Sequence, residues 1–282
     1  MLIRLGYEIE FKLAEETAIV AMLSVYPSRA IDLIEPDEAQ TEPQLAMNYY
    51  FDSFGNRCVR FVAPAGHLRI FGSTLILDSG EPDAVSLSAR ECPVGELPEE
   101  VLIFLLNSRY CEVDRFSGIA HELFGWTQQG WSRVKAICDW VHAKVRFDYM
   151  SARPTKTAMD LYTERVGVCR DFQHLAITFC RAMNIPARYA TGYLGDFGIP
   201  PSGPMDFSAW FEVYLENRWW TFDARHNFPR IGRVLMAVGR DASDVALTTS
   251  FGDAPLCSFS VVTEEESNNL TAVSRRPRLL SN

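Results

Sequence analysis

The sequence predicts an α+β fold in which an all-β N-terminal region precedes a domain of helices and antiparallel strands. Apolar and polar residues alternate strictly from Ile3 to Phe11, which is the pattern of a half-buried strand. Apolar residues recur at helical spacing from Phe172 to Met183, and Asn184-Ile185-Pro186 ends that run. Further on, Glu216-Asn217 separates two strand-like segments and predicts a tight hairpin.

The N-terminal third consists of short strand-like segments separated by turn signals. They are expected over residues 3–11, 17–26, 45–52, 57–63 and 67–77. This number and spacing of strands fits a small sandwich or barrel. The stretch from Ser79 to Glu100 is rich in Gly, Pro and acidic residues and predicts a linker. We therefore expect a β-rich domain over 1–95, a second domain over 96–262 and a polar tail over 263–282.

The second domain begins with helical patterns and ends with strand patterns. Helices are expected over 114–124, over 131–147 and from Cys169, and strands over 187–194, 208–215 and 218–223. Short connections between the last strands predict antiparallel pairing. We expect the helix from Cys169 to pack on this sheet.

Composition limits the classes of partner. The net charge of −9 gives no indication of a nucleic-acid or membrane partner, and no apolar run reaches the length of a membrane span. The seven cysteines are scattered, with no CxxC pair and no zinc-ligand spacing, so neither a metal nor a cofactor is predicted. Scattered cysteines without a signal-peptide pattern predict a cytoplasmic protein.

Cys169 is the candidate nucleophile, because it occupies the first turn of its predicted helix. The unpaired N–H groups and the positive dipole end favour a thiolate there by roughly 0.3–2 kcal/mol. That lowers a thiol pKa by about one unit at most, so Cys169 remains mostly a thiol at neutral pH unless a cation assists. The same position also suits a small buried core residue.

Three segments together resemble the core motif of the transglutaminase-like superfamily. They are Gly-Val-Cys169-Arg-Asp-Phe, Ser208-Ala-Trp-Phe-Glu-Val-Tyr-Leu and Trp219-Trp-Thr-Phe-Asp223. That superfamily includes transglutaminases and bacterial cysteine proteases or amidases, and the resemblance implies a papain-like α+β core. The N-terminal strands resemble the β region that accompanies this core in bacterial members.

The resemblance implies a Cys-His-Asp triad, in which Cys169 and Asp223 match and Ser208 stands at the histidine position. If Leu215 pairs with Arg218 across the hairpin, Ser208 and Asp223 share one face as diagonal neighbours. A histidine at 208 would therefore reach Asp223, whereas a serine cannot act as a general base near neutral pH.

Another histidine would have to supply the base. His226 has the opposite parity to Asp223, so it points to the other face if the strand continues, although a strand end would free it. His174 lies roughly 140° around the helix from Cys169 and faces away. Loss of a general acid–base costs about 10²–10⁴ in rate, so weak or no hydrolysis by the standard route is expected.

Two functions follow. The first is a cysteine-dependent amide hydrolase or acyltransferase that acts on a peptide or protein amide through Cys169, with the Cys169 backbone N–H holding the oxyanion. The second is a catalytically impaired homologue that serves as a peptide- or protein-binding module. The sequence leaves the substrate and the oligomeric state open.

Overall fold

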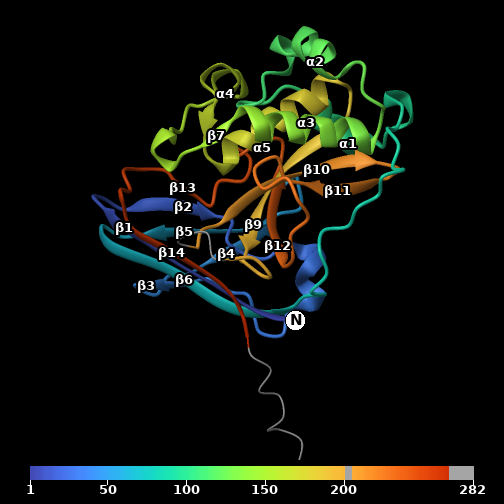
Figure 1. Ribbon diagram of the computed structural model, residues 1–282. Helices are drawn as coiled ribbons and strands as arrows, with labels where there is room; N and C mark the ends of the chain where they lie inside the picture. Colours follow the sequence, from blue (N-terminus) through green and yellow to red (C-terminus); the bar gives the residue numbers. More distant parts are fainter. Residues whose placement is uncertain (201–204, 267–282) are drawn as a thin grey trace, which may run out of the picture.

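The computed structural model describes residues 1–200 and 205–266. In this part of the chain, β-rich layers lie on one side and the helices gather on the other (Figure 1). The N-terminal region forms two four-stranded antiparallel sheets, with the strand orders β14-β1-β6-β3 and β13-β2-β5-β4. Their strands are β1 (Leu2–Leu13), β2 (Thr17–Ala21), β3 (Gln40–Glu42), β4 (Asn48–Phe51), β5 (Arg57–Ala63), β6 (Gly66–Leu77), β13 (Thr248–Ser250) and β14 (Leu256–Glu265).

The alternation predicted for the first strand is confirmed, because Ile3, Leu5 and Ile9 of β1 are buried in a core shared by the two sheets. The pairing of β13 with β2 and of β14 with β1 brings residues 248–265 into these sheets. These residues include part of the segment assigned to the second domain and the first residues of the predicted tail. Thr263 is buried opposite Leu5, so the tail prediction is wrong there. The rest of that tail, from residue 267, lies outside the described residues.

A third four-stranded antiparallel sheet has the order β11-β10-β9-β12. Its strands are β9 (Ala187–Leu194), β10 (Ser208–Leu215), β11 (Arg218–Phe222) and β12 (Arg233–Gly239). The helices are α1 (Glu99–Leu102), α2 (Ser117–Phe124), α3 (Trp131–Lys144), α4 (Ala158–Glu164) and α5 (Cys169–Ala182), and β7 (Arg146–Phe147) pairs in parallel with β8 (Val166–Gly167).

This third sheet is buried on both faces. Phe211 and Val213 of β10 join the core beneath α5, whereas Tyr193 and Val234 join the core of the N-terminal sheets. Helix α5 packs on β10 and β9, so the predicted α+β fold with the Cys169 helix on an antiparallel sheet is confirmed.

The predicted hairpin register is also confirmed. Leu215 lies opposite Arg218, and Phe211 lies opposite Phe222. Glu216 and Asn217 have φ values of 48° and 60°, which is the backbone that a two-residue turn between right-twisted strands requires.

Candidate active site

Cys169 is the first residue of α5, and only Val168 separates it from the short strand β8. Gly167 makes this approach possible, because a Cβ there would lie 2.6 Å from Leu161 Cδ1 and 2.9 Å from Asp171 Oδ2. Asp171 Oδ2 accepts a hydrogen bond from the Val168 N–H at 3.0 Å and closes the first turn of the helix. The sequence Gly-Val-Cys-Arg-Asp therefore fixes the position of the thiol locally.

The Cys169 side chain lines a cavity of about 60 Å³ with Ser208, Arg225 and His226. Burial raises the pKa of the Cys169 thiol to about 11, and the positive charge of Arg225 opposes that rise. The group is therefore a thiol at neutral pH in the free protein, as the first-turn position alone also predicted.

Asp223 follows the last residue of β11 and is buried. Its Oδ1 accepts hydrogen bonds from Gln173 Nε2 at 3.1 Å and from the backbone N–H groups of Arg225 at 2.9 Å and His226 at 3.1 Å. Its Oδ2 accepts from His226 Nδ1 at 2.9 Å and from Arg233 Nη2 at 3.0 Å. Burial opposes ionisation, but the Arg233 charge and the His226 hydrogen bonds outweigh it and hold the pKa of Asp223 well below its usual range.

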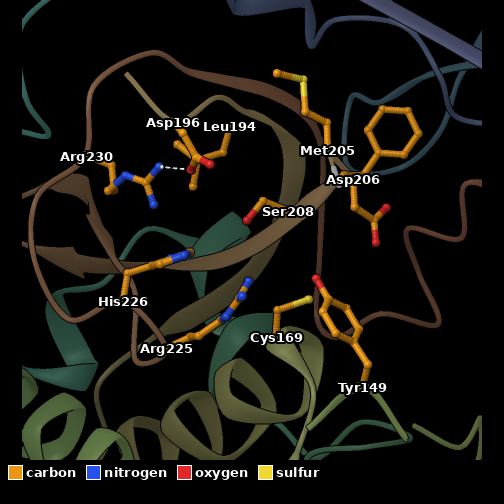
Figure 2. A pocket seen from close by; sticks show the side chains of 11 residues that line it. Tyr149, Cys169, Leu194, Asp196, Met205, Asp206, Ser208, Arg225, His226 and Arg230 are labelled. Atoms are coloured by element: carbon orange, nitrogen blue, oxygen red, sulfur yellow. Dashed lines mark hydrogen bonds and ion pairs between the residues drawn. The ribbon is translucent and has the colours of Figure 1, made fainter. Parts of the chain in front are cut away.

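His226 does not point away from Asp223. The orientation expected from strand parity is wrong, because β11 ends at Phe222 and the chain turns back within the next residues. The ionised Asp223 carboxylate can only accept, so Nδ1 of His226 carries the proton of this hydrogen bond, and in the neutral form of the ring Nε2 is an acceptor. In Figure 2 the His226 ring points into the cavity that Cys169 lines.

Ser208 is the first residue of β10 and lines the same cavity as the Cys169 thiol and the His226 ring (Figure 2). His174 lies elsewhere, as expected: it is buried and stacks on Tyr110 with ring centroids 5.0 Å apart. Its Nε2 accepts from the Ala242 N–H at 3.1 Å, and burial lowers its pKa to about 3. His174 is therefore a core residue and not a base for Cys169.

Gln173 and Arg233 position Asp223, and neither was singled out from the sequence. The fully buried Gln173 donates to Ala209 O and accepts from the Ala224 N–H, both at 3.1 Å, which ties α5 to β10 and to the turn after β11. Gln173 lies four residues after Cys169 on the same helical face, and this spacing alone could have indicated that its side chain lies near the site. Arg233 bonds Asp83 Oδ2 at 2.8 Å as well as Asp223, and only the strand order brings these residues together.

Arg225 and Tyr149 also reach the cavity and were not predicted. The Arg225 guanidinium points into the space between His226 and Cys169, and the Tyr149 hydroxyl points toward the Cys169 sulfur (Figure 2). Within residues 1–200 and 205–266, no hydrogen bond joins the Cys169 thiol to the His226 ring.

Neither a metal site nor a membrane-spanning helix occurs in the described ranges. These contain no cluster of His, Cys, Asp and Glu arranged to hold a metal ion, and none of their helices is long and apolar enough to cross a membrane.

Comparison with known proteins identifies the family and supports the fold. Residues 117–224 match the model of the transglutaminase-like superfamily. A crystal structure of a candidate cysteine protease from Cytophaga hutchinsonii is 30% identical, with a TM-score of 0.82, over 94% of this chain and 90% of that one. The chain belongs to the transglutaminase-like superfamily. An uncharacterised protein of Mycobacterium leprae is 24% identical over 217 residues, which are 74% of this chain and 77% of that protein.

The segment that matches the transglutaminase-like superfamily contains Cys169, Ser208 and Asp223 but ends before His226. His226, the ring that is hydrogen-bonded to Asp223, therefore lies just beyond the part of the chain that the family pattern describes.

Proposed function

We propose that this protein is a cysteine-dependent amide hydrolase or acyltransferase in which Cys169 is the nucleophile and His226 replaces the histidine that Ser208 has displaced. The observation that carries the proposal is the 2.9 Å hydrogen bond between Asp223 and the His226 ring, because that ring lines the same cavity as the Cys169 thiol. A nucleophile, a base and a group that orients the base are the parts that such catalysis needs.

In the proposed reaction, Nε2 of His226 takes the proton of the Cys169 thiol as the sulfur attacks the amide carbonyl carbon. The oxyanion is held by the Cys169 backbone N–H at the start of α5 and by the Tyr149 hydroxyl. The imidazolium then gives its proton to the leaving amine, and the C–N bond breaks to leave a thioester. Water, or an acceptor amine, attacks the thioester with His226 again as the base, which releases an acid or a new amide and restores the thiol.

Two features of the free protein oppose fast chemistry. Burial favours the neutral thiol, and Cys169 and His226 are not hydrogen-bonded to each other within the described residues. They support the second candidate, a module that binds a peptide or protein amide without turnover. In the first candidate, substrate binding has to bring the thiol and the imidazole together, because catalytic hydrogen bonds often tighten only in the complex.

The two candidates are separated by acylation with p-nitrophenyl acetate, followed by intact mass spectrometry and by release of p-nitrophenol. For the enzyme we expect a single acyl group on Cys169, none in Cys169→Ala, and acylation slower by about 10²–10⁴ in His226→Gln. His121→Gln changes an exposed histidine of α2 and is the matched control. Acylation that is equal in His226→Gln and in the control would exclude His226 as the base, and absence of acylation on Cys169 would favour the binding module.

A further inference from the structure

Arg225 carries a guanidinium that lines the candidate active site and forms no ion pair within residues 1–200 and 205–266. Its backbone is fixed on both sides, because its N–H donates to Asp223 Oδ1 at 2.9 Å and its carbonyl oxygen lies 2.7 Å from His142 Nδ1. The guanidinium carbon lies 3.9 Å from the centroid of the Phe147 ring. Stacking occupies the face of a guanidinium and leaves the N–H donors at its edge available.

No carboxylate within these described residues lies at ion-pair distance from the Arg225 guanidinium. The other arginines near the site are paired: Arg233 bonds Asp83 and Asp223, and Arg230 bonds Asp196. Asp206 lines the same cavity but forms no ion pair with Arg225 within the described residues; burial raises the pKa of its carboxyl, and the Arg225 charge opposes that rise. The segments 201–204 and 267–282 contain no aspartate or glutamate in their sequence.

The position of Arg225 selects one side of the substrate. In the proposed reaction His226 gives a proton to the leaving nitrogen, so the leaving amine lies against His226. The Arg225 guanidinium points between His226 and Cys169 (Figure 2). A carboxylate one carbon away from the leaving nitrogen would therefore lie within reach of its edge.

We infer that the preferred substrate is an amide whose leaving amine is an α-amino acid with a free carboxylate, as at the C-terminus of a peptide or in an N-acyl amino acid, and that Arg225 binds that carboxylate. Arginine binds a carboxylate through two parallel N–H···O bonds, which fixes orientation as well as charge. The cavity of about 60 Å³ suits a group of a few atoms, such as a carboxylate. Hydrolysis then converts amide and water into an acid and a free amino acid.

This inference rests on the proposed function, because it takes the cavity to bind an amide substrate. Binding of such an amide can be measured without turnover. The test uses Cys169→Ala protein and isothermal titration calorimetry. The probes are N-acetyl-L-alanyl-L-alanine and N-acetyl-L-alanyl-D-alanine, each compared with its own C-terminal amide, which lacks the negative charge. We expect one of the acids to bind at least ten-fold more tightly than its amide, because only the acid can pair with Arg225.

Arg225→Gln should remove that ten-fold preference, and Arg225→Lys should retain part of it. Arg218→Gln is the matched control, because Arg218 also stacks on an aromatic ring, 4.0 Å from the Trp220 centroid, but is exposed at the hairpin end. Asp206→Asn should strengthen binding of the acid, because it removes a competing negative charge from the cavity. Equal binding of acid and amide, binding of neither, or a preference that survives in Arg225→Gln would overturn the inference, whatever the acylation of Cys169 shows.

Discussion

Oδ2 of Asp223 lies 2.9 Å from His226 Nδ1 and 3.0 Å from Arg233 Nη2, so one buried carboxylate oxygen accepts hydrogen bonds from both an imidazole ring and a permanent cation. Arg233 compensates the negative charge of the carboxylate in the low-dielectric interior. The carboxylate in turn fixes which ring nitrogen of His226 faces the cavity. The orientation of the proposed base therefore depends on a residue of β12 that does not contact the thiol cavity.

Asp223→Asn should lower the free energy of unfolding at pH 7 by about 2–4 kcal/mol, because it removes one partner of a buried ion pair. The pKa of Asp223 is depressed in the folded protein, so its contribution is present above the unfolded value near 3.9 and is lost as the pH falls below it. The difference between parent and variant should shrink as the pH falls from about 6 to below about 4. Urea unfolding across this range measures it. Asp253→Asn is the control at an exposed site, and a difference that grows on acidification would contradict the assignment.

Ser208→His should rescue activity in a His226→Ala background. Position 208 lies three residues before Phe211, the last residue of β10 that pairs with β11, and its side chain lines the cavity with Cys169 and His226, so a long side chain there is expected to reach Asp223. Removing His226 frees Oδ2 of Asp223 for the new imidazole, which would recover part of the roughly 10²–10⁴ that a general base supplies. The rate of p-nitrophenyl acetate turnover is compared with that of the triple variant that also carries Cys169→Ala. A folded double variant with no gain over His226→Ala would mean that position 208 cannot deliver a base to the thiol.

Cys169 should react with iodoacetamide faster than Cys138 or Cys180. Burial raises the pKa of the Cys138 and Cys180 thiols further than that of Cys169, and both are fully buried, whereas Cys169 opens on the cavity. The rate at Cys169 should rise with pH toward about pH 11 and fall in Arg225→Gln, because that charge favours the thiolate. Peptide mapping after brief labelling gives the rates, with the exposed Cys257 as internal reference. Labelling of Cys180 before Cys169 would remove the case for a functional thiol.

Gln173→Met should destabilise the protein by about 1–3 kcal/mol and slow acylation of Cys169. The substitution keeps the volume but leaves the buried Ala224 N–H without its acceptor, which carries the full desolvation cost. It also removes a donor from Asp223 Oδ1 and loosens the link between α5 and the turn that carries His226. Chemical denaturation and acylation kinetics measure the two effects, with Gln128→Met as an exposed control. An effect no larger than that of the control would show that Gln173 does not position the site.

The sequence by itself determined the elements and their local geometry. Strict alternation predicted β1, helical spacing predicted α5, and Glu216-Asn217 predicted the hairpin and its register, because each of these signals depends on neighbours within a few residues. The position of Cys169 at the start of a helix follows from the same short-range rules. The pairing of β13 and β14 with β2 and β1 was not predicted, because strands that meet across most of the chain share no local pattern.

Only the tertiary structure decided the partners of Asp223. Parity along the strand predicted that His226 points away, but β11 ends at Phe222 and the following turn brings the ring back to the carboxylate. Arg233 reaches Asp223 because β12 joins the sheet beside β9, and Gln173 reaches it because α5 packs across β10. The spacing of residues along a helix or strand determines the face from which each side chain projects. The strand order and the positions at which strands end determine which side chains from different elements come into contact.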